Sequence, residues 1–139
     1  MKLQQIVVGY DETPAAERAL ERAADLAKAF GAKVTVTSVA PITAPAARGV
    51  GPYDPIDSPA LHQEQLAHAR AKLADLGLEA ELVEGLGDPA RVIVELSDKR
   101  DADLIVVGTR EPGLIERLTG GSVSGKVEHK THRDVLIVH

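Results

Sequence analysis

The segment Asp103-Leu104-Ile105-Val106-Val107-Gly108 has the strongest secondary-structure signal in the chain. It is an unbroken run of aliphatic, mostly β-branched residues that ends in glycine. Such a run is typical of a strand in a parallel sheet that is covered by helices on both faces. We therefore expect residues 104–108 to form a central strand, and the segments before and after it predict the rest of the fold.

Short β-branched segments alternate with longer Ala/Leu-rich segments along the chain. The other expected strands are 5–9, 33–39, 78–83 and 135–138, and helices are expected from Pro14, Pro59, Pro89 and Ser122. The first three helices share a start signal, which is a Thr, Ser or Asp cap followed by proline at the first helical position. This order predicts an α/β fold with a single open sheet of five parallel strands, helices on both faces, and one domain over residues 1–139.

Apolar spacing predicts which side of each helix is buried. Alternating steps of four and three residues place one stripe of the first helix on the core: Ala16, Leu20, Ala23, Ala27 and Phe30. The corresponding stripe of the second helix is Leu61, Leu66, Ala69, Leu73 and Leu76. Among polar residues, His62, His68 and His139 are expected at the surface, and Asp101 and Asp103 as solvated loop carboxylates.

Composition excludes several classes of protein. The 139 residues include 16 Lys and Arg, 21 Asp and Glu, and no Cys, for a net charge of −5. Without cysteine there is no disulfide framework, thiolate nucleophile or Cys-ligated metal. The acidic balance and the scarcity of aromatic residues argue against nucleic-acid binding. No apolar run approaches the roughly 20 residues of a membrane span, and no signal peptide is recognisable, so we expect a cytoplasmic protein.

Ligands of open α/β sheets bind beyond the carboxyl ends of the strands, where the strand order reverses. Three segments are expected at such ends: 9–13, 39–41 and 108–124. The last contains Gly120-Gly121-Ser122 before a helix, and backbone N–H groups at a helix start can bind an anion such as phosphate. On these residues alone, a helix capped by Ser122 after a flexible turn remains the alternative.

The same segments lack the patterns of common nucleotide-dependent or hydrolytic enzymes. The first turn, Gly9-Tyr10-Asp11-Glu12-Thr13, has only one glycine, so it is not a dinucleotide-binding fingerprint, and there is no phosphate-loop lysine motif. The serines lack the Gly-x-Ser-x-Gly setting of a nucleophile elbow. We identify no catalytic residue and no metal site.

The spacing from Gly108-Thr109-Arg110 to Gly121-Ser122 resembles the phosphate loop of the universal stress protein family, which follows the pattern G-x2-G-x9-G-[S/T]. The resemblance spans the whole chain, because 6–11 look like the first strand and Asp of that family and 134–138 like its last strand. One position departs from the pattern: Glu111 stands where the nucleotide-binding branch has its second glycine.

The resemblance implies strand order 3-2-1-4-5, a homodimer through strand 134–139, and a cytoplasmic stress-response module that binds an adenine nucleotide. ATP, alone or with Mg, is the leading ligand. Carried over position by position, Asp11 would hold the ribose or adenine, the main chain of Val39 would meet the adenine edge, and the glycine-serine loop would cradle the phosphates. The implied binding residues are Gly9, Tyr10, Asp11, Val39, Val107, Gly108, Arg110, Gly121, Ser122, Val123 and Ser124.

Several alternatives remain open on the sequence. The Glu111 carboxylate would repel a triphosphate, which favours either AMP or cyclic AMP or a nucleotide-free member that acts through dimer contacts. From the enzyme class, a slow ATP hydrolase is the alternative. Taken without the resemblance, Asp11 is equally explained as a turn-forming residue before a helix, and Val39 as core. The proline- and glycine-rich segment 40–57 is expected to be a loop, and we hypothesise that it closes over the ligand as a lid.

Overall fold

The computed structural model describes residues 2–40, 59–109, 127 and 131–139. Five parallel strands form one sheet in the order β3-β2-β1-β4-β5, which confirms the predicted fold class and strand order. The segment 40–57 beyond Ala40, the lid hypothesis and the helix expected from Ser122 lie outside the described residues. The elements are β1 (Gln5–Gly9), α1 (Pro14–Phe30), β2 (Lys33–Ala40), α2 (Pro59–Asp75), β3 (Ala80–Leu86), α3 (Pro89–Lys99), β4 (Leu104–Gly108) and β5 (Asp134–Val138).

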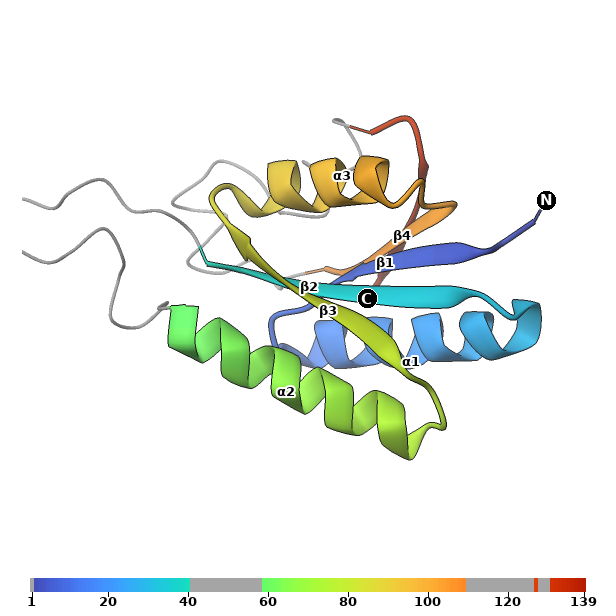
Figure 1. Ribbon diagram of the computed structural model, residues 1–139, viewed down its shortest axis with the longest axis horizontal. Helices are drawn as coiled ribbons and strands as arrows, with labels where there is room; N and C mark the ends of the chain where they lie inside the picture. The colour runs from blue at the N-terminus through green and yellow to red at the C-terminus, as the bar shows by residue number, and fades with distance from the viewer. Residues whose placement is uncertain (1, 41–58, 110–126, 128–130) are drawn as a thin grey trace, which may run out of the picture.

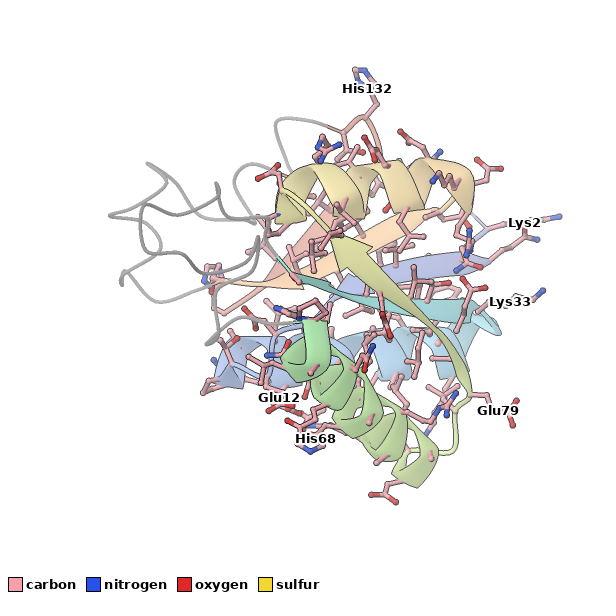
Figure 2. All side chains as sticks on the ribbon, turned by 60° about the vertical axis from the view of Figure 1, so that its left-hand side comes forward. Lys2, Glu12, Lys33, His68, Glu79 and His132 are labelled. Atoms are coloured by element: carbon pink, nitrogen blue, oxygen red, sulfur yellow. The ribbon has the colours of Figure 1, made fainter. Side chains whose placement is uncertain are left out.

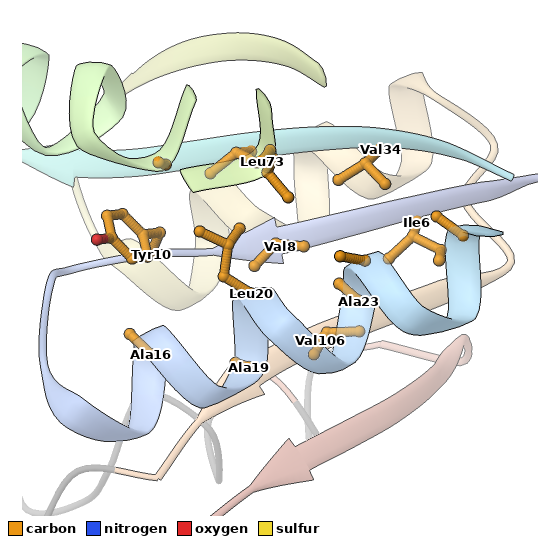
Figure 3. Packing of buried hydrophobic residues seen from close by; sticks show 14 of the residues in the cluster. Ile6, Val8, Tyr10, Ala16, Ala19, Leu20, Ala23, Val34, Leu73 and Val106 are labelled. Atoms are coloured by element: carbon orange, nitrogen blue, oxygen red, sulfur yellow. The ribbon is translucent and has the colours of Figure 1, made fainter. Parts of the chain in front are cut away.

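Helices cover both faces of the sheet, with α1 and α2 on one side and α3 on the other (Figure 1). Alternate strand residues feed two separate cores. Ile6 and Val8 of β1 belong to the larger core against α1 and α2, whereas Val7 belongs to the smaller core under α3. Figure 3 shows the larger core, in which Leu20 of α1 lies among the side chains of β1 and α2.

The predicted helix starts at Pro14 and Pro89 are confirmed with their caps. The Thr13 hydroxyl accepts from the Ala16 amide at 3.2 Å, and Asp88 accepts from the Arg91 amide at 3.0 Å. These bonds satisfy amides that the first helical turn leaves unpaired.

Two predictions about the elements are wrong in detail. The third strand begins at Ala80 and ends at Leu86, not 78–83, because the Leu78 amide donates to Leu73 O at 2.8 Å and so belongs to the close of α2. The strand then extends to Leu86 because β2 pairs with it along its whole length. Phe30 is 59% exposed rather than buried, since it ends α1 beyond the last buried residue of that helix, Ala27.

Asp103 also differs from the prediction of a purely solvated carboxylate. Its Oδ2 accepts from the amides of Gln4 and Gln5 at 2.8 and 3.0 Å, and so ties the start of β1 to the loop before β4. None of the helices in the described ranges has the length and apolar character needed to cross a bilayer.

Candidate functional site

The strand order reverses between β1 and β4, which are neighbours in the sheet although β2 and β3 come between them in the sequence. Connections that leave such a pair diverge and open a crevice at the carboxyl edge. In this register Gly9 lies beside Val107 on one side and Thr37 of β2 on the other. The structure therefore brings the ends of β1, β2 and β4 together at one edge, as the sequence predicts.

The glycines at this edge have packing roles of their own. A Cβ on Gly108 would lie 2.6 Å from the carbonyl carbon of Ala15 and 2.7 Å from the amide nitrogen of Ala16. A Cβ on Gly9 would lie 2.7 Å from Cδ1 of Ile93. Gly108 thus lets the first turn of α1 pack directly on the end of β4. This close packing explains the glycine without a ligand.

The turn Asp11-Glu12-Thr13 connects β1 to α1 and holds the carboxylate of the candidate ligand residue. Asp11 Oδ1 accepts from the amide and the hydroxyl of Thr13, at 3.2 and 2.7 Å. This is the turn-forming role that the sequence left as the alternative. An ionised carboxylate has about four acceptor sites, so these bonds are compatible with a further one to a ligand.

Glu12 takes a left-handed backbone conformation in this turn, with φ of 61°. For a residue other than glycine such a conformation costs roughly 1–3 kcal/mol and persists only where its surroundings enforce it. Next to this turn, Nδ1 of His68 on α2 lies 2.6 Å from Glu12 Oε1. Figure 2 shows the two labelled side chains side by side where α2 passes the turn.

Tyr10 turns its side chain away from the edge. Its ring is buried in the larger core, its hydroxyl donates to Glu17, and its amide donates to Thr37 O at 2.9 Å. Burial, reinforced by the hydrogen bond to Glu17 and that carboxylate's charge, raises the pKa of Tyr10 far above its ordinary value. Only the main chain of Tyr10 is therefore in a position to serve a ligand at the edge.

Val39 and Val107 belong to the smaller core, where their side chains pack under α3. The core interpretation of Val39 is thus correct for its side chain, and a contact through its main chain remains a prediction. The structure places Gly9, Asp11, Val39 and Gly108 at the ends of adjacent strands or just beyond them. The other predicted ligand residues lie outside the described part of the chain: Arg110, Gly121, Ser122, Val123 and Ser124.

A buried polar cluster beside this edge was not predicted. It consists of Ser38 near the end of β2 and of His62 and Gln65 on α2, which are 1%, 6% and 8% exposed. The expectation that His62 lies at the surface is wrong because α2 packs this polar face over Ser38. A signal was present in the sequence: His62 and Gln65 share the helical spacing of Leu66, Ala69 and Leu73, and all five are buried.

Only one assignment of donors and acceptors satisfies the hydrogen bonds of this cluster. The Asp11 carbonyl can only accept, so the Gln65 Nε2 group faces it, at 3.4 Å, and Gln65 Oε1 faces Ser38. The Ser38 hydroxyl therefore donates to Gln65, at 2.6 Å, and accepts from the protonated Nδ1 of His62. With its proton committed to Gln65, Ser38 is not a nucleophile activated by His62 as general base.

The helix α2 is further tied to α1 by charge. Lys72 Nζ lies 2.7 Å from Glu17 Oε2 and 3.0 Å from Glu21 Oε1. Burial on its own raises the pKa of Glu17, but hydrogen bonds from Lys72 and Tyr10 outweigh it, and the pKa lies below its ordinary value. Across the part of the chain that the structure describes, no cluster of His, Asp or Glu is arranged to hold a metal ion.

Comparison with known proteins agrees with this architecture. Residues 2–139 match the model of the universal stress protein family. The universal stress protein MJ0531 of Methanocaldococcus jannaschii is 32% identical, over 97% of this chain and 81% of its own length.

Two solved structures combine a similar sequence with a similar fold. A universal stress protein in complex with cAMP is 30% identical, with a TM-score of 0.75 over 100% of this chain and 98% of the other. The universal stress protein of Archaeoglobus fulgidus in complex with dAMP is 28% identical, with a TM-score of 0.69 over 100% of both chains. The match over nearly the whole length and the shared fold lead to one conclusion: the chain belongs to the universal stress protein family.

Proposed function

We propose that this protein binds an adenine nucleotide at the carboxyl edge of β1, β2 and β4 and serves as a stress-response module through its nucleotide-bound state. The observation that carries the proposal is the similarity, over the full chain, to two universal stress proteins in complex with cAMP and dAMP. The two proteins share an adenine nucleotide as ligand. The reversal of strand order between β1 and β4 supports this edge as the place of binding, since ligands of open α/β sheets bind there.

In this proposal the described residues serve the adenosine end of the ligand. Asp11 offers carboxylate oxygens to ribose hydroxyls or to the adenine amino group, which are donors. The main chain at Val39 and at Gly9 would offer polar groups, because the side chain of Val39 packs in the smaller core under α3 and Gly9 has none. Arg110, Gly121, Ser122, Val123 and Ser124, with Val107 and Gly108 before them, would serve ribose and phosphates on the sequence pattern alone.

ATP, alone or with Mg, is the ligand that the family resemblance puts first, and AMP or cyclic AMP is the second candidate. The second is favoured by the cAMP and dAMP of the two similar structures and by the charge of Glu111 in the sequence. A carboxylate about 4 Å from a phosphate costs roughly 1–4 kcal/mol, and a triphosphate extends further toward it than a monophosphate.

The test is thermal unfolding of the protein with ATP and Mg, AMP, cyclic AMP, and GTP as a control for the base. Free ligand at about 100 times Kd stabilises the protein by roughly 2.7 kcal/mol, so a binding ligand raises Tm by several degrees. We expect adenine nucleotides to raise Tm and GTP to leave it unchanged. Equal Tm with and without every adenine nucleotide contradicts the proposal and favours a nucleotide-free member of the family.

The variant Glu111→Gly distinguishes the two candidate ligands. If the carboxylate excludes the triphosphate, the variant gains affinity for ATP by about tenfold and keeps its affinity for AMP. An unchanged ratio of the two affinities would show that Glu111 does not select the ligand. Hydrolysis of ATP belongs to the proposal only as a slow side reaction, for which we name no catalytic residue.

The proposal also includes three features that the sequence or the family resemblance leads us to expect. They are a single domain over residues 1–139, a homodimer through strand 134–139, and a location in the cytoplasm. The family match over 2–139 supports the first. The dimer has its own test, given in the Discussion, and cell fractionation with an antibody to the protein tests the third.

A further inference from the structure

The helix α2 presents an unusual inner face to the β1–α1 turn. A helix that covers a sheet normally buries an apolar stripe. Here two of the five buried residues of α2 are His62 and Gln65, and both contact polar groups of other elements. One turn further along, His68 reaches Glu12. Three residues of this helix, spaced three positions apart, thus contact the segment that carries Asp11 or the strand beside it.

The hydrogen bonds of this face form a chain that leads from α2 to the β1–α1 turn. The bonds run from His62 Nδ1–H to Ser38, from Ser38 to Gln65 Oε1, and from Gln65 Nε2–H to Asp11 O. The chain of bonds ends on the carbonyl of the residue whose carboxylate is the candidate ligand group. It ends just before Glu12, whose left-handed backbone needs outside support.

We propose that Gln65, held by Ser38 and His62, is a positioning residue that sets the orientation of the Asp11 peptide and so prepares the turn for nucleotide. The inference rests on the proposed function, but its first half concerns the turn itself and is independent of any ligand. The bond to the Asp11 carbonyl restrains rotation about the Cα–C bond of Asp11, and so limits how the backbone of the turn moves relative to β1. In this way α2, which touches the edge through side chains, controls a site formed mainly by main-chain groups and one carboxylate.

The exposed residue Gln63 provides a matched control for Gln65 on the same helix. Gln65→Met keeps the length of the side chain and removes both hydrogen bonds, and Gln63→Met makes the same exchange where the side chain faces solvent. A second pair addresses His62. Asn and Leu have the same shape, but only His62→Asn keeps an N–H group near the place of Nδ1–H. We therefore expect His62→Leu to lose the hydrogen bond to Ser38 and His62→Asn to keep it.

The first measurement is amide hydrogen exchange of the ligand-free protein. The Thr13 amide donates to Asp11 Oδ1 in the turn, whereas the Ala32 amide donates to Ala27 O at the far end of α1 and serves as internal reference. We expect Gln65→Met to speed exchange of Thr13 by up to about tenfold with little change at Ala32, because the variant loses the partly buried hydrogen bond to the Asp11 carbonyl. Gln63→Met and His62→Asn should leave both amides unchanged.

The second measurement is the Kd of ATP and of AMP by calorimetry, at a temperature where urea titration shows each variant to be fully folded. Gln65→Met and His62→Leu should raise the Kd of the nucleotide by about tenfold, and Gln63→Met and His62→Asn should leave it unchanged. A residue that only stabilises the fold would lower the unfolding free energy without changing either Thr13 exchange or Kd.

Each outcome decides a separate question. If the unaltered protein binds nucleotide and Gln65→Met changes neither Thr13 exchange nor Kd, the inference is wrong and the proposed function stands. If the unaltered protein binds neither ATP nor AMP, the proposed function fails together with the ligand half of the inference, and Thr13 exchange alone then decides whether Gln65 holds the turn. The inference is supported if Thr13 exchange is faster and nucleotide binding weaker in Gln65→Met and His62→Leu, and if both properties are restored in His62→Asn.

Discussion

Two threonines on β2 differ in one respect that matters for stability. Thr35 and Thr37 are 2% and 0% exposed. Thr35 Oγ1 accepts from Gln5 Nε2 at 2.8 Å, whereas Thr37 Oγ1 has no hydrogen-bond partner among the described residues. A buried polar group without a partner costs roughly 1–3 kcal/mol, while a satisfied one contributes about 1 kcal/mol.

The pair gives a prediction in which one substitution has opposite effects at two positions. Thr37→Val should raise the unfolding free energy by about 1 kcal/mol, because it removes a buried hydroxyl for which the described part of the chain offers no partner. Thr35→Val should lower it by about 1 kcal/mol, because Gln5 loses its acceptor. Urea titration of both variants measures the difference, and a loss of stability in both would contradict the assignment of Thr37 as unsatisfied.

Local signals in the sequence predicted single residues well where the structure depends on near neighbours. Thr13 caps α1 because the bond to Ala16 spans one helical turn and needs no other element. His62 could not be placed in the same way, since its burial depends on Ser38, which is 24 positions away in the sequence. Phe30 continued the apolar spacing of α1, but that spacing contains no information on where the sheet beneath the helix ends.

At the scale of elements, α1 and α2 are joined by a link that depends on charge. Lys72 holds Glu17 and Glu21, and Glu17 also accepts from Tyr10. The folded pKa of Glu17 is lowered from its ordinary 4.5, although burial alone would raise it, because the bonds from Lys72 and Tyr10 favour the carboxylate. A carboxyl group of this kind stabilises the fold above its unfolded pKa and loses that contribution as pH falls through the folded value.

Glu17→Gln should therefore lower the unfolding free energy near neutral pH, and the difference from the unaltered protein should shrink as the pH falls below 4.5. The group is about one-third exposed, so solvent reduces the effect. Urea titrations across this pH range measure it. In a Lys72→Met background the same exchange should show much less pH dependence. A constant difference from neutral to acid pH would rule out the proposed charge link.

The boundaries of β3 show what sequence patterns leave open for a whole element. The weak alternation from Leu78 to Val83 indicated a strand but not its register. Because β2 pairs with it from Val34 to Ala40, the strand extends to Leu86. Leu78 lies outside the strand, because its amide donates to Leu73 O at the end of α2. The edge of the sheet was predictable because every strand carboxyl end lies there. The polar face of α2 beside it was not predicted, although His62 and Gln65 share the spacing of the buried residues of that helix.

For the molecule as a whole, the two edges of the sheet differ in charge. The β3 edge has exposed carboxylates, Glu81 and Glu84, and charged edge residues discourage pairing with another chain. The β5 edge has three consecutive aliphatic residues, Val135, Leu136 and Ile137, all half-buried and none charged. An apolar edge strand of this kind is normally covered or paired.

This asymmetry favours the β5 edge as the surface for a second copy of the chain and leads to the last prediction. The protein should sediment as a dimer, and Ile137→Lys should shift it to monomer, because a charged side chain would have to lose its hydration in the interface. The matched control, Glu84→Lys on the opposite edge, should remain a dimer. Both variants should keep the far-ultraviolet circular dichroism of the unaltered protein, which separates loss of assembly from loss of fold. A monomeric unaltered protein would contradict the dimer, and a dimer lost only with Glu84→Lys would place the interface at the β3 edge instead of β5.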